Sequence, residues 1–525
     1  MAPRFDPLVA LPAELVLRIL EFVPASGLAS LTRASKPWHE FIDTVHQDLI
    51  YSAPSKTEHP TSACNFSFLS ELKSFAKYFD GVTTFKDLCK RQTLLRRTWA
   101  SSRPMTRESI YQIGNDSVWR FKPDFKRRFV VSTSQSGGVN VTDMDNGRLL
   151  WSLSHDEVRP YAHLEYQDGT AVWDREGNAL EVWEADEGAR GVFRRMAVLH
   201  HGCETRGFQL SYNTLCVVSS EGYGFVYDMA RDPPQLKKRL DIEHGAIGHL
   251  DQNEHVVLYS MGTAGYHVHS KDTGALLGVL DPKHCTELFH IEHPFEHTGS
   301  LVPGSHGRTA TLFPPQHPHA HRFESLHLET GPHPGEEHVG VRPVLEDDEW
   351  GAGMLYGNIM VGVSRSNRMM VCSDWRRALQ SPPSLAATSA LLECAYDGGS
   401  TFDLGGWLSV KDGRVLFEVA DMVYVVTLDD DGDIPLKVDA PGKTQRPMYA
   451  ASTSSAPQFG TPVSFMALYD DCIMATYATI GWDRADDRYR DFDNIVYRPS
   501  TEPRPRLFAI KAIRVLSFAP DPSRY

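Results

Sequence analysis

The sequence predicts a multidomain protein in which a small all-α region precedes an all-β propeller of seven or eight blades. Three observations support this fold class. Apolar residues in roughly the first hundred positions recur at steps of three and four, the period of a helix buried on one face. From about residue 110 the period changes to two, and Gly, Asp, Asn and Pro separate short β-forming runs. Those runs repeat about every 42 residues, which is typical of four-stranded propeller blades.

The first helices are expected between residues 11 and 51. Pro12 lies in the first turn of a short helix that Pro24 ends, a second helix follows, and Pro37 opens a third. The apolar positions that recur at helical spacing are Leu11, Leu15, Ile19, Phe22 and Val23, then Leu28 and Leu31, then Trp38, Phe41, Ile42 and Val45. About forty residues are too few to bury this much apolar surface internally, so we expect some of these side chains to pack against another surface.

Periodicity alone leaves two interpretations of this region open. It is either a helical cap packed on the rest of the chain or a module that docks on a separate protein. The residue identities favour docking, because this stretch resembles the F-box. The positions that match the F-box pattern are Leu11, Pro12, Glu14, Leu15, Ile19, Leu20, Pro24, Leu28, Leu31, Lys36 and Trp38. Pro37 departs from the pattern, since a basic or polar residue is usual there.

The F-box resemblance implies a partner and a set of contact residues. F-boxes bind the small Skp-type adaptor of a cullin-RING ubiquitin ligase, and a second domain in the same chain holds the substrate. We place the F-box at residues 5–51. The residues that the resemblance implies for adaptor binding are Leu11, Pro12, Glu14, Leu15, Ile19, Leu20, Pro24, Leu28, Leu31 and Trp38.

Residues 52–109 are expected to form a loop and linker helices. A Pro, Ser and Thr-rich loop comes first, and apolar residues at helical steps then predict a helix over 67–79. A second helix is expected to start at Thr84, because Asp87 three residues later completes a capping box. This second helix is similar to the linker helix that follows the F-box in F-box proteins with WD-type repeats.

Residues 110–525 are assigned to the propeller. Setting strand centres at Thr142, Trp183, Tyr227 and His269 gives separations of 41, 44 and 42 residues. The repeats resemble degenerate WD blades, since turns at 143–147 and 271–274 stand where that family leaves its third strand. Trp183 is the repeat aromatic that matches the signature Trp, and none of the four strand centres carries the Trp-Asp pair itself.

Beyond residue 281 the repeat becomes irregular. Further strands are expected at 325–331, 369–375, 422–432 and 507–516, and long insertions are expected near 281–345 and 432–462. A propeller needs its ends joined so that no sheet edge is left exposed. We expect a strand near Val118–Phe121 to pair with the C-terminal strands and close the ring.

Composition limits the partners and the compartment. The net charge of −14 argues against nonspecific binding to nucleic acid or anionic lipid, so proteins are the expected partners. No apolar run is long enough to span a membrane, and Pro12, Glu14 and Arg18 interrupt any signal-peptide core. Eight scattered cysteines without a CxxC pair indicate a reducing compartment, so the cytoplasm or nucleus is expected.

The chain offers no recognisable catalytic motif, and we predict neither a metal nor a cofactor. His317, His319 and His321 alternate on one side of an extended segment, but no spaced Cys or carboxylate completes a metal site. Nucleophile elbows, phosphate-binding loops and dinucleotide fingerprints are missing from the sequence.

Two hypotheses about function follow. The first is a non-catalytic substrate receptor of an SCF-type ubiquitin ligase, which joins the adaptor and cullin scaffold to an unknown target on the propeller. The alternative is a propeller enzyme or small-molecule binder with an unrelated helical cap, which requires polar groups converging at the propeller centre. A phosphorylated target would need an arginine cluster, and otherwise the arginines are solvated surface charges. The arginines available are Arg159, Arg194, Arg195, Arg206, Arg365 and Arg368.

Overall fold

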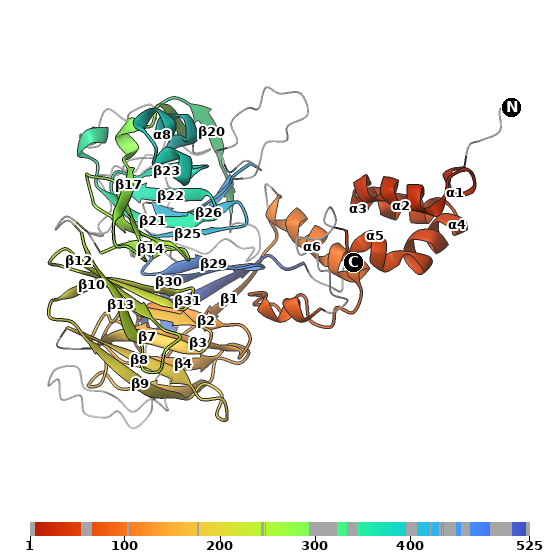
Figure 1. Cartoon of the computed structure of the whole chain (residues 1–525). Coiled ribbons are helices and arrows are strands. Elements are labelled where there is room, and N and C mark those ends of the chain that lie inside the picture. Colours follow the sequence, from red (N-terminus) through yellow and green to blue (C-terminus); the bar gives the residue numbers. More distant parts are fainter. Residues whose placement is uncertain are drawn as a thin grey trace, which may run out of the picture. The chain divides into compact units, whose positions relative to one another are not determined.

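The structure is a computed structural model, and its chain divides into two compact units (Figure 1). One unit comprises Met1–Arg107, Tyr469–Cys472 and Ser517–Tyr525, and the other comprises Glu108–Leu468 and Ile473–Leu516. Among the described residues, no helix combines the length and the apolar character needed to cross a bilayer. The residues that the structure describes are 6–53, 66–101, 104–175, 178–242, 246, 248–292, 323–332, 344–394, 407–419, 422–429, 432, 434, 448–452, 463–482 and 507–520.

The first unit opens with short helices that prolines delimit. They are α1 (Pro7–Ala10), α2 (Ala13–Phe22), α3 (Ala25–Ala34), α4 (Lys36–His39), the π-helix η1 (Glu40–Val45) and α5 (Gln47–Tyr51). Pro12 and Pro24 stand immediately before α2 and α3, as the sequence predicts. The third predicted helix is instead divided among α4, η1 and α5. Val16, Leu20, Leu28, Ile42 and Ile50 form the buried side of these helices, each at most 2% exposed.

The predicted helix over 67–79 is wrong, and long-range hydrogen bonds explain why. Only the 3-10 turn η2 (Ser67–Glu71) forms, and Lys77 adopts a φ of +54°. The backbone N–H groups of Phe75 and Ala76 donate to the buried carboxylate of Asp471 at 2.8 and 2.9 Å. Because these donors are used by a residue almost four hundred positions away, the segment does not build a helical ladder.

The second predicted linker helix is confirmed as α6 (Phe85–Trp99). The Thr84 hydroxyl accepts the backbone N–H of Asp87 at 3.1 Å, which satisfies one of the donors left open at a helix start. The buried face of α6 includes Leu88, Cys89 and Trp99. Trp99 stacks on Phe518 with ring centroids 3.5 Å apart, so the C-terminal segment completes the core of this unit.

The second unit is a seven-bladed β-propeller, because its strands form seven sheets whose inner strands contact one another in sequence around a ring (Figure 1). The first four blades are regular antiparallel sheets. They consist of β2 (Val118–Asp124), β3 (Phe129–Ser134), β4 (Val139–Asp143) and β5 (Leu149–Leu153); β6 (Leu164–Gln167), β7 (Thr170–Arg175), β8 (Ala179–Ala185) and β9 (Phe193–His200); β10 (Thr205–Ser211), β11 (Thr214–Ser219), β12 (Tyr223–Asp228) and β13 (Gln235–Asp241); and β14 (Leu250–Gln252), β15 (Val256–Ser260), β16 (Tyr266–Ser270) and β17 (Leu276–Leu280).

The repeat predicted from sequence corresponds to the third strand of each of these four blades. Thr142, Trp183, Tyr227 and His269 lie in β4, β8, β12 and β16. The two expected turns follow the third strands of the first and fourth blades. In both turns the glycine has a positive φ, at Gly147 (+70°) and Gly274 (+80°), and its N–H donates to a backbone carbonyl four residues back.

The fifth and sixth blades receive additional edge strands from the part of the chain between residues 281 and 345. β18 (Glu287–Glu292) and β20 (His327–Thr330) extend the fifth sheet, and β19 (Glu324–Ser325) extends the sixth. The predicted strand at 325–331 therefore lies at sheet edges. The main strands are β21 (Trp350–Tyr356), β22 (Ile359–Ser364), β23 (Arg368–Cys372) and β24 (Ser389–Glu393) in the fifth blade, and β25 (Leu408–Lys411), β26 (Arg414–Val419), β27 (Met422–Thr427) and β28 (Met448–Ser452) in the sixth.

Short helical elements surround the fifth blade. η3 (Pro282–His284) and η4 (Leu345–Asp347) flank the extra edge strands in the sequence, and α7 (Trp375–Ala378) and α8 (Pro382–Thr388) connect β23 to β24. Within the stretch predicted as an insertion at 432–462, β28 supplies the fourth strand of the sixth blade. Residues 293–322, 333–343 and 435–447, with His317, His319 and His321, lie outside the described residues.

The seventh blade joins the two ends of the propeller sequence. Its strand order is β1-β31-β30-β29, where β1 is Arg107–Tyr111, β31 is Leu507–Ser517, β30 is Cys472–Trp482 and β29 is Met466–Leu468. The predicted closure through Val118–Phe121 is wrong, since these residues belong to β2 in the first blade. The closing strand comes earlier in the chain, and its polar sequence RESIY, with no fully buried side chain, lacks the apolar alternation that predicts strands.

Apolar side chains between neighbouring sheets form the propeller core. Phe129, Trp173 and Phe193 pack between the first two blades, and Tyr266 and Trp350 pack between the fourth and fifth. One close contact joins the third and fourth blades. A Cβ added at Gly224 in β12 would lie 2.4 Å from the hydroxyl of Tyr259 in β15. That hydroxyl is buried and has no hydrogen-bond partner within the described part of the chain.

Gly224→Ala should destabilise the propeller by about 1–3 kcal/mol, because the new methyl group overlaps the Tyr259 hydroxyl. Tyr259→Phe should leave stability unchanged or raise it, since it removes an unpaired buried hydroxyl. The double variant should recover most of the loss, as the nearest remaining ring atom is 3.2 Å from the added carbon. Denaturant unfolding of the three variants measures this coupling, and strictly additive effects would contradict the proposed clash.

Candidate functional site

Helix α2 has apolar side chains on two faces, and only one of these faces is buried. Val16 and Leu20 are 2% and 1% exposed. On the other face Leu15, Ile19 and Phe22 are 53%, 52% and 75% exposed, although they follow one another at steps of four and three. Large exposed side chains grouped on one helix face are typical of a protein interaction surface. We call Leu15, Ile19 and Phe22 the exposed α2 face.

Other exposed apolar residues come from the neighbouring helices. Val9 in α1 is 85% exposed, Val45 in η1 is 62% exposed and Leu49 in α5 is 61% exposed. Arg18 pairs with Glu21 and lies over the Phe22 ring, with its Cζ atom 5.5 Å from the ring centroid. The helical part of the first unit therefore combines a small core with an incompletely covered apolar surface.

The structure separates the predicted adaptor-contact residues into surface and core positions. Leu15 and Ile19 are exposed together with Pro12, Glu14 and Pro24, whereas Leu11, Leu31 and Trp38 are half-buried. Leu20 and Leu28 are 1% and 0% exposed, so they support the fold of the helices from inside. Sequence spacing did not separate these two groups, because apolar residues occur on both sides of α2.

Comparison with known families identifies the helical region. The F-box domain family matches residues 8–48. These residues are an F-box domain. No curated protein sequence matches the chain. The F-box domain is therefore the part of the first unit that carries the exposed α2 face, and the propeller follows it in the sequence.

Several solved structures are similar to this chain at low identity. The computationally designed protein Ika8 has 14% identity and a TM-score of 0.39, covering 70% of this chain and 95% of its own. U3-55K has 8% identity and a TM-score of 0.40, covering 78% and 98%. BamB from Moraxella catarrhalis has 11% identity and a TM-score of 0.37, covering 79% and 99%. The propeller assignment rests on the sheet topology of this chain.

Polar and aromatic residues gather around the axis of the propeller, where the inner strands of different blades begin. We call Arg120, His163, His249, Trp407 and Phe465 the axial cluster. Trp407 connects it, because its ring lies 5.5 Å from that of His249 in the fourth blade and 6.1 Å from that of Phe465. Arg120 of β2 places its Cζ atom 3.8 Å from the Trp407 ring centroid. One indole thus contacts side chains from the first, fourth and seventh blades.

A second layer of charged side chains lies next to the axial cluster. It consists of Lys122, Glu165 and Asp251, each two residues after a member of the cluster. The Lys122 ammonium lies 2.9 Å from Glu165 and 4.8 Å from the Phe465 ring centroid. Glu165 also lies 3.2 Å from Nε2 of His163. Asp251 accepts the backbone N–H of Leu355 at 2.7 Å and is 6% exposed. Residues i and i+2 point to the same side of a strand, so each inner strand contributes to both layers.

Burial and neighbouring charges shift the pKa values of these groups. Burial raises the pKa of Asp251 to about 7, and the nearby Glu165 adds to the effect. Burial alone would raise the pKa of Glu165, but Lys122 and His163 lower it overall. Burial and the positive charge of Arg120 both lower the pKa of His163. Burial lowers the pKa of Arg120 itself to about 9. Arg120 therefore stays cationic at neutral pH.

This axial cluster was not predicted as a site, although part of its signal is present in the sequence. Arg120 and Lys122, His163 and Glu165, and the pair at 249 and 251 are each separated by one residue at the start of an inner strand. Only the ring topology shows that these strands meet. Among the described residues, no group of three His, Cys, Asp or Glu side chains could hold a metal ion.

The six arginines considered for a phosphorylated target do not form a free anion site, because each already donates to an acceptor. Five of them form ion pairs with carboxylates and Arg206 donates to a backbone carbonyl. These pairs are Arg159–Asp174 at 2.9 Å, Arg194–Glu184 at 2.9 Å, Arg195–Glu181 at 3.2 Å, Arg206 to the Ala246 carbonyl at 3.0 Å, Arg365–Glu349 at 2.5 Å and Arg368–Asp348 at 2.9 Å.

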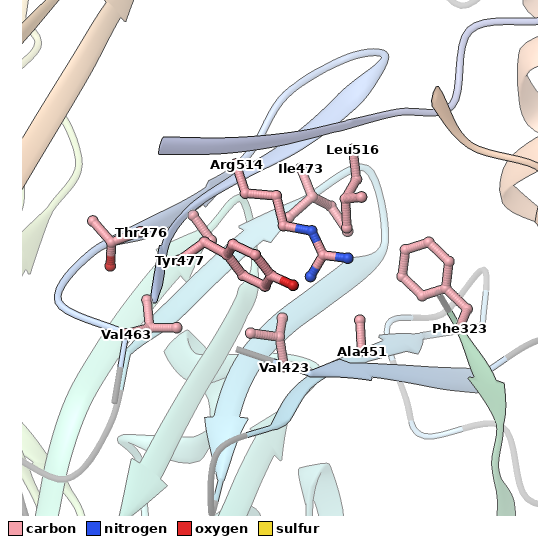
Figure 2. A pocket seen from close by; sticks show the side chains of 10 residues that line it. Phe323, Val423, Ala451, Val463, Ile473, Thr476, Tyr477, Arg514 and Leu516 are labelled. Atoms are coloured by element: carbon pink, nitrogen blue, oxygen red, sulfur yellow. The ribbon is translucent and has the colours of Figure 1, made fainter. Parts of the chain in front are cut away.

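A small pocket between the sixth and seventh blades has a largely apolar lining. Figure 2 shows Arg514 and Tyr477 beside each other above Val423 and Ala451. Arg514 places its Cζ atom 4.4 Å from the Tyr477 ring centroid, and its Nε donates to Glu108 at 2.7 Å. Since Glu108 already accepts a hydrogen bond from this guanidinium, the pocket is a weaker binding candidate than the axial cluster.

The raised pKa of Asp251 predicts a pH-dependent contribution to stability. Below about pH 4 the carboxyl is protonated in both folded and unfolded chains. Between about pH 4 and 7 only the folded chain holds the proton, so stability falls as pH rises, by on the order of 4 kcal/mol from this group. Above about pH 7 the contribution is constant. Asp251→Asn should remove this loss, because the amide is neutral and its oxygen can still accept the Leu355 N–H.

Denaturant unfolding of the two proteins at intervals from pH 4 to 8 measures the difference. The variant should match the parent near pH 4 and exceed it near pH 8. Parallel stability curves for the two proteins would show that Asp251 does not titrate in this window.

Proposed function

We propose that the chain is the substrate-recognition subunit of a cullin-RING ubiquitin ligase of the SCF type. In this proposal the F-box domain binds a Skp-type adaptor, which joins the chain to the cullin scaffold, and the propeller holds a target protein. The observation that supports it most directly is the exposed α2 face within the matched F-box domain.

Burial of the exposed α2 face supplies the driving force for adaptor binding. Fully burying a large apolar side chain contributes about 1.5–3 kcal/mol, and Leu15, Ile19 and Phe22 are 53%, 52% and 75% exposed. Leu15, Ile19 and Phe22 together can therefore provide several kcal/mol on leaving water. Leu20 and Leu28 contribute indirectly, because they hold α2 and α3 in the folded domain.

The receptor in this proposal does no chemistry of its own. Ubiquitin transfer belongs to other subunits, and the receptor raises the effective concentration of the target and orients its lysines. The loops of a closed propeller remain available for target binding whichever state the F-box domain is in. We propose action in the cytoplasm or nucleus, where the eight cysteines of the chain would remain reduced.

The double variant Leu15→Ala, Ile19→Ala of the full chain should lose adaptor binding while remaining folded. Both side chains are about half exposed, so truncating them removes little of the core. A cost of about 1.4 kcal/mol for each truncation would raise the dissociation constant about a hundredfold. Surface plasmon resonance with a purified Skp-type adaptor measures the change.

Two variants control this experiment. Leu276→Ala alters a residue of β17 that is 48% exposed, so it should keep full adaptor affinity. Leu20→Ala should instead lower the thermal midpoint of the F-box domain, because it leaves a cavity in the core. Full adaptor affinity in the folded double variant would refute the proposed contact surface.

The same double variant tests the receptor role in a reconstituted ligase. Once a target has been recovered by co-purification, the variant should still capture it but should fail to support its ubiquitination. It should also inhibit the parent chain by occupying the target unproductively. Undiminished ubiquitination by the variant would contradict recruitment through the exposed α2 face.

A further inference from the structure

Three arginines of the described propeller are buried, and one of them differs from the others. Arg120, Arg368 and Arg514 are 6%, 8% and 7% exposed. Arg368 donates to Glu393 and Asp348, both at 2.9 Å, and Arg514 donates to Glu108 at 2.7 Å. The enclosed Nε of Arg120 has no hydrogen-bond partner among the residues that the structure describes. The other two buried guanidinium groups thus donate to carboxylates, whereas Arg120 is attracted by the charges of Glu165 and Asp174 while its Nε lacks an acceptor.

Aromatic rings hold the Arg120 guanidinium in place without satisfying its donors. Its Cζ atom lies 3.8 Å from the centroid of Trp407, 5.6 Å from that of Trp119 and 5.9 Å from that of Phe465. A cation over an aromatic face is attracted to the ring, but the N–H groups in the guanidinium plane still require acceptors. A buried cation that lacks an acceptor destabilises the fold.

The axial cluster around Arg120 reaches solvent. Trp407, His163 and His249 are half-buried, and they come from three different blades. The second layer beneath already uses its own cation, because Lys122 lies 2.9 Å from Glu165. Arg120 is therefore the cation in this cluster that is positioned to donate hydrogen bonds to a ligand bound at the propeller axis.

We propose that the axial cluster is a carboxylate-binding site in which Arg120, supported by Trp407, accepts one carboxylate group from a ligand. A guanidinium and a carboxylate match in geometry and charge. The second layer favours a carboxylate over a phosphate, because the ionised Glu165 would repel a dianion more strongly than a monoanion. A small organic acid and the acidic side chain of a peptide both carry this group. The site belongs to the propeller and does not depend on adaptor binding.

The full chain can be tested by thermal unfolding in sodium acetate, with sodium chloride at equal ionic strength as the reference. Acetate should raise the thermal midpoint in proportion to the logarithm of its concentration above saturation. Arg120→Met should abolish this rise, because the variant has no guanidinium to bind the acetate. Arg120→Lys should bind acetate at least about tenfold more weakly, since it loses the planar donor pair.

Arg514→Met is the matched control, because Arg514 is equally buried and stacked but already has Glu108 as its acceptor. It should lower the unliganded midpoint and keep the full response to acetate. Equal acetate responses in the parent and in Arg120→Met would overturn the proposal, as would no response in the parent to any carboxylate.

Two peptides distinguish the sources of the carboxylate. They are acetylated, amidated Gly-Gly-Glu-Gly-Gly and its Gln counterpart, and isothermal titration calorimetry measures their binding. Binding of the Glu peptide alone would support a protein-borne acid, whereas binding of acetate and larger free acids without the peptide would support a small organic acid. A response to inorganic phosphate without any response to carboxylates would overturn the assigned ligand class.

Discussion

The buried carboxylate of Asp471 is the interaction on which the organisation of the first unit depends. It accepts the Ser74 hydroxyl at 2.7 Å and the backbone N–H groups of Phe75 and Ala76. Burial raises its pKa, and these hydrogen bonds oppose that shift. Because donor and acceptor are 397 positions apart, the conformation of the linker depends on a residue far along the chain. The Trp99–Phe518 stack adds a second such connection.

Much of the fold could be predicted from local sequence. Prolines delimit α2 and α3, the Thr84 cap starts α6, and turns ending in Gly147 and Gly274 follow third strands. Each of these features depends on residues within a few positions of one another. The prediction failed where distant residues decide the conformation, as in the non-helical segment at 67–79 and the polar closing strand β1.

The candidate sites show the same division between local and long-range information. The F-box domain could be located from a short sequence pattern. The exposed fractions in the structure were needed to distinguish the surface residues Leu15 and Ile19 from the core residues Leu20 and Leu28. The axial cluster needs the closed ring, because Arg120 and Trp407 are nearly three hundred positions apart in the chain. A sequence period can predict blades, yet it does not specify which side chains meet at their common axis.

Closure of the ring between β1 and β31 has a consequence for synthesis on the ribosome. The outer strand of the seventh blade, β1, is synthesised before the other described propeller strands and its neighbour β31 after them, so β1 stays unpaired while the strands between them are made. Ser517–Tyr525 likewise joins the first unit only after the propeller strands before it have been synthesised. A nascent chain stalled before β31 would expose an unpaired sheet edge to chaperones and proteases, so both units are completed only after β31 has been synthesised.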